Sequence, residues 1–342
     1  MAGGGSKMAV FTAITANSIV MVAKFIGFAL TGSGSMLSEA IHSLADVGNQ
    51  ALLAFGMKQS AKPADDAHPF GYGLEAFVWS LISAVGIFFV GCGLSLMHAF
   101  EAFHEYFYGH GEGHYESPGM IAIGILLFSL VIEGISLGIA VAGVMRDAKS
   151  QGYTLLQYVK KTDDPFGVAI LAEDGAAVLG VVIALVAVLM AEYTHNPLWD
   201  ATGTLLIGLL LGWVAMFLIA KNRGFLLGKA VGEDKQEIIA SILSEDPAVE
   251  KVAIQRAVVR GTDRFRISAE LDMYGEYIAQ LWLKDQDLPA LHAELDSPEK
   301  LRAFLTRYGE TVLELTGDEI DRLEQTLRDA LPKARDIALE PD

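Results

Sequence analysis

Six long apolar stretches fill the first two thirds of the chain, and they constrain its fold more than any other feature. Each is close to the roughly 20 residues that a helix needs to cross a bilayer. The stretches cover residues 8–31, 34–57, 76–100, 119–145, 167–190 and 201–220. The chain is therefore predicted to be an α-helical membrane protein with six transmembrane helices.

Composition agrees with this prediction and narrows the range of partners. Hydrophobic residues make up 52% of the chain and charged residues 20%, and a soluble domain usually carries more charge. One Cys excludes a disulfide framework and any multi-Cys zinc module. The net charge of −17 argues against nucleic acid and anionic lipid as partners and suits a protein that handles cations.

Charge is concentrated after Phe225, where most of the Lys, Arg, Asp and Glu residues lie. This shift predicts a transmembrane transport domain over 1–224 and a water-exposed α/β domain over 225–342. The second domain is predicted to be an open-faced, ferredoxin-like sheet with helices on one side. Its expected elements are a helix at 234–246, paired strands at 249–260 and 264–274, a charged helix at 318–331 and an edge strand at 334–342.

The loops predict an orientation. Alternate loops have no Lys or Arg, so the positive-inside rule puts both termini and residues 225–342 in the cytoplasm. The N-terminal MAGGGSK lacks the Arg-rich amphipathic character of a transit peptide, so we expect a bacterial inner membrane. The basic residues on the cytoplasmic side are Lys58, Lys62, Arg146, Lys149, Lys160, Lys161, Lys221, Arg223 and Lys229.

Ionisable side chains inside a membrane span are costly and usually have a function or a partner. In the second span, Glu39, His42, Asp46 and Asn49 share one helix face. His42 and Asp46 are one turn apart, a spacing that can hold one divalent cation. The alternative is a polar stripe that only joins helices.

The fifth span carries the adjacent acids Glu173 and Asp174 in an otherwise apolar run. Neighbours on a helix project about 100° apart, so the two cannot point equally well at one centre. Asp174 is the preferred metal ligand. Glu173 either completes the coordination shell, accepts a proton or pairs elsewhere.

Other ionisable residues leave alternatives open. Glu133 is either a proton-relay group or a residue that joins helices. For Lys24, an ion pair or a side chain that snorkels to the membrane surface is favoured over a part in transport. Asp65 and His68, in the turn between spans 2 and 3, form a possible weak second metal site or a solvated turn. The His-rich loop 101–116 is favoured as a solvated loop over a weak metal trap.

Together these segments resemble the cation diffusion facilitator family, nearest to its branch of mitochondrial zinc transporters and their bacterial relatives. The likeness covers nearly the whole chain. It is carried by TGSGSMLSEAIHSLADVGNQ (31–50), the PADDAHPFGYG turn, LAEDGAAVLG (171–180), NPLWDATG (196–203) and the tail 315–342.

The resemblance implies a homodimeric antiporter that exchanges a divalent cation, most often zinc, for protons and exports it from the cytoplasm by alternating access. It implies a transport site formed by His42 and Asp46 of the second span and Asp174 of the fifth. The family often has a His four residues before that aspartate, but this chain has Ile170. Glu173 then takes the fourth ligand position, and the oxygen-rich set favours broader selectivity towards manganese, cobalt or iron.

Two more departures from the family pattern change what is expected. Asp65 and His68 match the second family site, but Tyr72 replaces its last His, so that site is weakened. Residues 225–342 hold only His292, which favours dimerisation over zinc binding for that domain.

Two other functions fit parts of the sequence. A membrane zinc protease needs a His-Glu-x-x-His pair, which the sequence lacks, so an enzyme is not expected. A metal-binding sensor that does not transport fits the number of ligands, but it leaves the buried acids on two different spans unexplained.

Overall fold

The computed structural model divides into two compact units, residues 1–227 and 228–342. It describes residues 3–32, 34–108, 119–150, 152–162, 165–262 and 264–342. Residues 109–116 of the predicted His-rich loop, with His110 and His114, lie outside the described residues, whereas residues 101–108, with His104, continue a helix instead of forming a loop.

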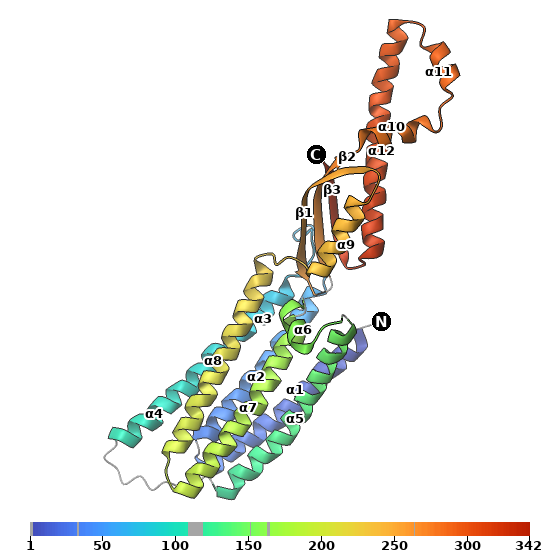
Figure 1. Ribbon diagram of the computed structural model, residues 1–342. Helices are drawn as coiled ribbons and strands as arrows, with labels where there is room; N and C mark the ends of the chain where they lie inside the picture. The colour runs from blue at the N-terminus through green and yellow to red at the C-terminus, as the bar shows by residue number, and fades with distance from the viewer. Residues whose placement is uncertain (1–2, 33, 109–118, 151, 163–164, 263) are drawn as a thin grey trace. The chain divides into compact units, whose positions relative to one another are not determined.

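The first unit consists of helices joined by turns, with its long helices packed side by side (Figure 1). Its elements are α1 (Gly3–Thr31), α2 (Gly34–Ser60), α3 (Glu75–Gly86), the π-helix η1 (Ile87–Gly93), α4 (Leu94–Tyr108), α5 (Gly119–Ser150), the short α6 (Leu155–Lys161), α7 (Pro165–Thr194) and α8 (Leu198–Leu226). The α3–η1–α4 segment runs as one helical stretch, Glu75–Tyr108.

Four helices among the described residues are long and apolar enough to cross a membrane: Glu75–Tyr108, Met120–Ser150, Gly167–Thr194 and Leu198–Leu226. The apolar part of α1 is shorter, Asn17–Thr31. In α2 the polar stripe interrupts the apolar sequence. That α1 and α2 also span the bilayer stays a prediction.

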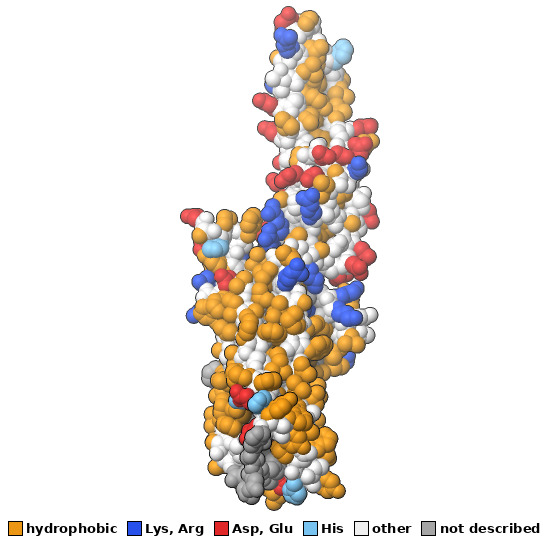
Figure 2. Space-filling view, turned by 90° about the vertical axis from the view of Figure 1, so that its left-hand side faces the viewer, with side chains coloured by type: hydrophobic (Ala, Val, Ile, Leu, Met, Phe, Trp, Pro, Cys, Tyr) orange, Lys and Arg blue, Asp and Glu red, His pale blue; other side chains and the backbone are white. Residues whose placement is uncertain are grey.

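The outside of this unit suits contact with lipid. Hydrophobic side chains cover much of its visible face (Figure 2), and large apolar residues such as Phe89 and Trp213 are each 69% exposed. In water such a continuous apolar surface would be a liability, because monomeric soluble proteins rarely expose one.

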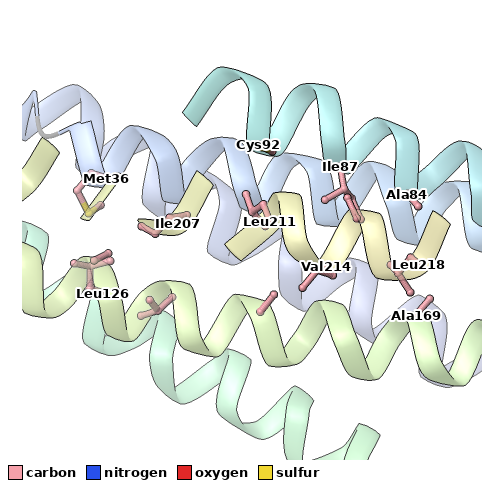
Figure 3. Close-up of a cluster of buried hydrophobic side chains, with 14 of the residues drawn as sticks. Met36, Ala84, Ile87, Cys92, Leu126, Ala169, Ile207, Leu211, Val214 and Leu218 are labelled. Carbon is pink, nitrogen blue, oxygen red and sulfur yellow. The ribbon is translucent and has the colours of Figure 1, made fainter. Parts of the chain in front are cut away.

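The interior of the helical unit centres on α8. Its Ile207, Leu211, Val214 and Leu218 are buried between the α3–α4 segment and α7 (Figure 3). α2 contacts α1, α3, α7 and α8, so its polar stripe is enclosed by other helices rather than by lipid. This enclosure allows ionisable side chains to be retained at membrane depth.

The second unit combines helices with a three-stranded sheet. Its elements are α9 (Glu233–Ser244), β1 (Val249–Gly261), β2 (Arg264–Met273), α10 (Gly275–Leu283), α11 (Leu288–Glu294), α12 (Pro298–Ala330) and β3 (Ala334–Pro341). The strand order is β1-β2-β3, antiparallel between β1 and β2 and parallel between β2 and β3. The ferredoxin-like arrangement stays a prediction.

Alternation along the central strand builds the core of this unit. Phe265, Ile267, Ala269 and Leu271 of β2 are buried, with intermediate residues between them. α9 contributes the buried Ile239 and Leu243, and α12 contributes Leu323 and Leu327.

One helix boundary differs from its prediction. The charged helix expected at 318–331 is the end of α12, which begins twenty residues earlier at Pro298. Ser297 caps this start by accepting a hydrogen bond from the Lys300 amide, and Pro298 fits the first helical position because its missing N–H is not needed there.

Candidate functional site

The polar face of α2 is buried inside the helical unit. Glu39, His42, Asp46 and Asn49 are all less than 10% exposed. The helix period puts them one above another, and the contacts of α2 with α1 and α7 turn this face inward. The predicted stripe is therefore a column of ionisable and amide groups in the protein interior.

His42 and Asp46 form the centre of this column. The imidazole Nε2 lies 3.4 Å from Asp46 Oδ2, and both side chains are nearly inaccessible. An imidazole nitrogen and a carboxylate oxygen one helical turn apart are donors that divalent transition metals accept together.

α7 carries the two acids predicted in the fifth span, and both are buried. The Glu173 carboxylate lies close enough to Asp46 of α2 for the two acids to repel each other, and it also lies near the Asn49 amide. Its Oε2, and both side-chain polar atoms of Asn49, have no hydrogen-bond partner among the described residues. Buried polar atoms normally have partners, so these unsatisfied atoms mark a place suited to a polar or cationic ligand.

Asp174 points to a different neighbour. Its Oδ2 accepts a hydrogen bond of 2.8 Å from the Ser136 hydroxyl of α5. In the described part of the chain, no three His, Cys, Asp or Glu side chains converge closely enough to hold a metal ion. The four predicted transport-site residues thus lie in one buried region, with only the α2 pair close together.

Gly180 allows α7 to approach the α2 column. A Cβ atom at this position would lie 2.7 Å from Glu39 Oε1 and 3.4 Å from His42 Nδ1, and the first distance is below normal contact. Any larger residue would push these side chains away, so the small residue sets the separation of α2 and α7.

Lys24 and Glu133 form a buried ion-pair network with Glu39. The Lys24 ammonium on α1 lies 2.7 Å from Glu39 Oε2 and 2.7 Å from Glu133 Oε1 on α5. The ion pair predicted for Lys24 is confirmed. Glu133 connects α5 to α1 through Lys24, which agrees with one of the two roles predicted for it, that of joining helices. A buried charge is tolerated when it is paired in this way.

The sequence prediction did not include Ser136 as part of the site. Its position, three residues after Glu133, puts both on one face of α5. The sequence signal that could have identified Ser136 is a hydroxyl one helical turn from an acid inside an apolar span.

The turn between α2 and α3 carries Asp65 and His68 on the surface. Asp65 Oδ1 accepts the amides of Ala67 and His68, and its Oδ2 accepts the Tyr72 hydroxyl at 2.8 Å. The hydrogen bond from Tyr72, with those from the backbone, holds the pKa of Asp65 below its usual value. His68 Nδ1 is 3.6 Å from Asp65 Oδ1 and its ring packs on Tyr72. Asp65 therefore stabilises the turn, and the second metal site stays a prediction.

In the second unit, His292 lies near the end of α11 and is exposed. Its helix buries none of its residues.

A family model for the cation efflux transmembrane domain matches residues 10–227. The mouse "Proton-coupled zinc antiporter SLC30A9, mitochondrial" is 38% identical over 98% of this chain and 59% of its own length. "Metal tolerance protein C4" of Arabidopsis thaliana is 34% identical over 98% of this chain and 73% of its own length. "Magnetosome protein MamM" of Magnetospirillum gryphiswaldense is 28% identical over 73% of this chain and 72% of its own. The chain thus spans less than two thirds of the length of the animal relative.

Proposed function

The chain belongs to the cation efflux family, a family of multi-pass membrane transporters rather than enzymes, and from this premise we propose that it is a divalent-cation/proton antiporter with Zn²⁺ as its main substrate. The observation that carries the proposal is the buried His42–Asp46 pair beside two further acids on α7. The mouse relative is named a proton-coupled zinc antiporter, which supports zinc as the transported ion and protons as the coupled ion.

The transport site we propose consists of His42, Asp46, Asp174 and Glu173. One imidazole and carboxylate oxygens suit Zn²⁺, which takes four such ligands. Ser136 holds Oδ2 of Asp174, which leaves Oδ1 available to a cation. Glu173 and Asp46 repel each other, and a cation bound between them would relieve this repulsion, which supports Glu173 as the fourth ligand.

Proton coupling follows from the chemistry of these ligands. His42 must be neutral and the carboxylates ionised to bind a metal, so a bound cation and bound protons exclude one another. A cation also reduces the cost of keeping several carboxylates together in a medium of low dielectric constant. Protons arriving from the more acidic side would then displace the metal, and proton re-entry would drive export.

Alternating access needs the site to open to one side of the membrane at a time. We propose that this occurs through relative movement of the helices that supply the ligands, α2 and α7. Their ligands sit on two separate elements, so a small shift between the helices changes the coordination geometry and hence the affinity.

The metal preference rests on the oxygen-rich donor set. Ile170 packs against the hydrophobic core of the helical unit and offers no donor one turn before Asp174. Oxygen ligands suit Mn²⁺ better than imidazole does, so transport of manganese, cobalt or iron is the alternative within the same family. A sensor that binds metal without moving it is the alternative outside transport.

The proposal extends to assembly and location. We propose a homodimer, with residues 228–342 serving dimerisation, because this unit has His292 as its single imidazole. We also propose six membrane crossings, from the six apolar stretches, and a cytoplasmic location for both termini, from the loop charges. The bacterial inner membrane stays a prediction, since the animal relatives are named as mitochondrial.

The test is uptake of ⁶⁵Zn²⁺ into proteoliposomes with an imposed pH gradient. Asp46→Asn and Asp174→Asn should abolish gradient-driven uptake, and Glu173→Gln shows whether the fourth ligand is correctly assigned. Glu192→Gln removes a carboxylate from the same helix, α7, outside the site, and should retain uptake. Wild-type protein that binds zinc but gives no flux with zinc, manganese or cobalt would favour the sensor.

A further inference from the structure

The Lys24 side chain is the centre of a charged cluster that the proposed ligand set does not use. It is 1% exposed, although Lys is one of the residues least often buried. Its ammonium contacts Glu39 of α2 and Glu133 of α5 at equal distances of 2.7 Å. Three helices, α1, α2 and α5, thus meet at one buried cation.

The two carboxylates of this cluster differ in what else they touch. Glu39 binds Lys24 through Oε2, while its Oε1 lies 3.9 Å from Nδ1 of His42. Both Oε1 and Nδ1 are buried and have no hydrogen-bond partner among the described residues. Glu133 makes the same contact with Lys24, but in the described structure it forms no ion pair with His42.

The imidazole of His42 therefore has two different sides. Nε2 faces Asp46, at 3.4 Å, and Nδ1 faces Glu39. A histidine that binds metal through one nitrogen commonly donates the N–H of the other to a carboxylate, which fixes its tautomer and ring orientation. An inward movement of less than about 1 Å brings Glu39 Oε1 to hydrogen-bond distance from Nδ1.

We propose that Glu39, anchored by Lys24, is a positioning residue that holds the Nδ1–H of His42 and so directs Nε2 to the transported cation. The inference rests on the proposed transport function. Lys24 fixes Oε2 of Glu39, Gly180 of α7 leaves room for Oε1, and after the inward movement described above Oε1 reaches the Nδ1–H of His42. Through this chain of contacts α1 and α5 influence a site to which they contribute no metal ligand of the proposed set.

The experiment compares Glu39→Gln with Glu133→Gln in the full-length protein. Both variants replace a carboxylate that lies 2.7 Å from the Lys24 ammonium by a neutral amide, so a purely structural role predicts equal effects. Co²⁺ binding is measured in detergent by the visible absorption of the bound ion. The KM for ⁶⁵Zn²⁺ is measured in proteoliposomes, and the melting temperature serves as a check on folding.

We expect Glu39→Gln to weaken Co²⁺ binding and raise the KM at least tenfold, the usual effect of removing a partner of a metal-binding histidine. Glu133→Gln should change the Co²⁺ affinity and the KM for ⁶⁵Zn²⁺ by less than threefold each. In a His42→Gln background, Glu39→Gln should have no further effect on binding, because it acts through the imidazole.

Equal effects of the two glutamine variants, or an effect of Glu39→Gln that persists in the His42→Gln background, would overturn the inference and leave the cluster as a link between helices. Glu39→Asp and Glu133→Asp keep both charges and shorten each side chain, so they give the same comparison if a glutamine variant does not fold. Wild-type protein that neither binds nor transports Co²⁺ or Zn²⁺ would instead overturn the proposed function.

Discussion

The Ser136 hydroxyl donates a hydrogen bond of 2.8 Å to Oδ2 of Asp174 and so connects α5 with the acidic turn of α7. The contact orients the carboxylate without blocking it, because Oδ1 stays available. Removing the hydroxyl is therefore expected to weaken the site without removing a proposed ligand.

Ser136→Ala should raise the KM for ⁶⁵Zn²⁺ by about tenfold and leave the maximal rate nearly unchanged, since a hydrogen bond to a charged group contributes about 1.5–3 kcal/mol. Ser129→Ala is the matched control. Ser129 lies on the same helix and is fully buried, and its hydroxyl has no hydrogen-bond partner among the described residues. A KM unchanged by Ser136→Ala would contradict an orienting role.

Gly180→Ala should lower both the melting temperature and the affinity for zinc. The added methyl would meet Glu39 Oε1 at 2.7 Å, and Lys24 restrains that carboxylate from moving aside. Overpacking of this kind costs about 1–3 kcal/mol. Isothermal titration calorimetry and a thermal shift measurement check the two effects.

Gly175→Ala is the control for that substitution. Gly175 is on the same helix, but a Cβ there meets nothing within 4 Å. Alanine also favours a helix over glycine by about 1 kcal/mol, so stability should be unchanged or higher. Equal losses in the two variants would show that close packing at Gly180 is not special.

Ile170→His should shift the selectivity of transport towards zinc and away from manganese by about tenfold. The substitution puts an imidazole one helical turn before Asp174, and imidazole suits Zn²⁺ better than Mn²⁺. Uptake of ⁶⁵Zn²⁺ in competition with Mn²⁺ measures the ratio. Ile170→Val, which keeps the position apolar, should leave the ratio as in the wild type.

Arg322 and Asp246 predict an acid-sensitive region in the second unit. Two hydrogen bonds of 2.7 and 3.0 Å join the Arg322 guanidinium to the Asp246 carboxylate. Although burial opposes it, these bonds and the Ala248 amide hold the pKa of Asp246 below its usual value. The pair should therefore stabilise the fold at pH values above the ordinary Asp pKa of about 4, and this stability should be lost as the pH falls through the lowered value.

Arg322→Gln should reduce this pH dependence, because only the Ala248 amide then remains, and should remove about 1 kcal/mol of local stability, measured by hydrogen exchange of α12 in the full-length protein. Arg328→Gln is the control, because the Arg328–Glu324 contact is longer, at 3.6 Å. Protection of α12 that is equally sensitive to acid in wild type and Arg322→Gln would exclude this pair as the cause.

The sequence was most informative where one residue type recurs at a fixed spacing. The polar period of α2 predicted that Glu39, His42, Asp46 and Asn49 share a face, because a helix fixes that geometry locally. The apolar lengths likewise predicted helices near their observed positions in the first unit. The start of α12 was not predicted. The polar residues after Pro298 do not show whether they belong to a separate helix or to the same helix as residues 318–331.

Contacts between helices were harder to predict. Lys24, Glu39 and Glu133 are far apart in the chain, and nothing in their local sequences shows that one ammonium meets both carboxylates. Ser136 was overlooked for the same reason, because its partner is on another helix. Sequence spacing specifies neighbours along one helix, whereas packing decides which helices face one another.

The position of His42 and Asp46 on a single helix has a consequence for any cycle of binding and release. Their separation is set by the pitch of α2, so this half of the proposed coordination sphere keeps a constant spacing whichever way the protein is open. The other half of the proposed set comes from α7 and depends on how the two helices pack against each other. A rigid-body movement of α2 against α7 can therefore change the affinity for the cation over a wide range while the ligands stay the same.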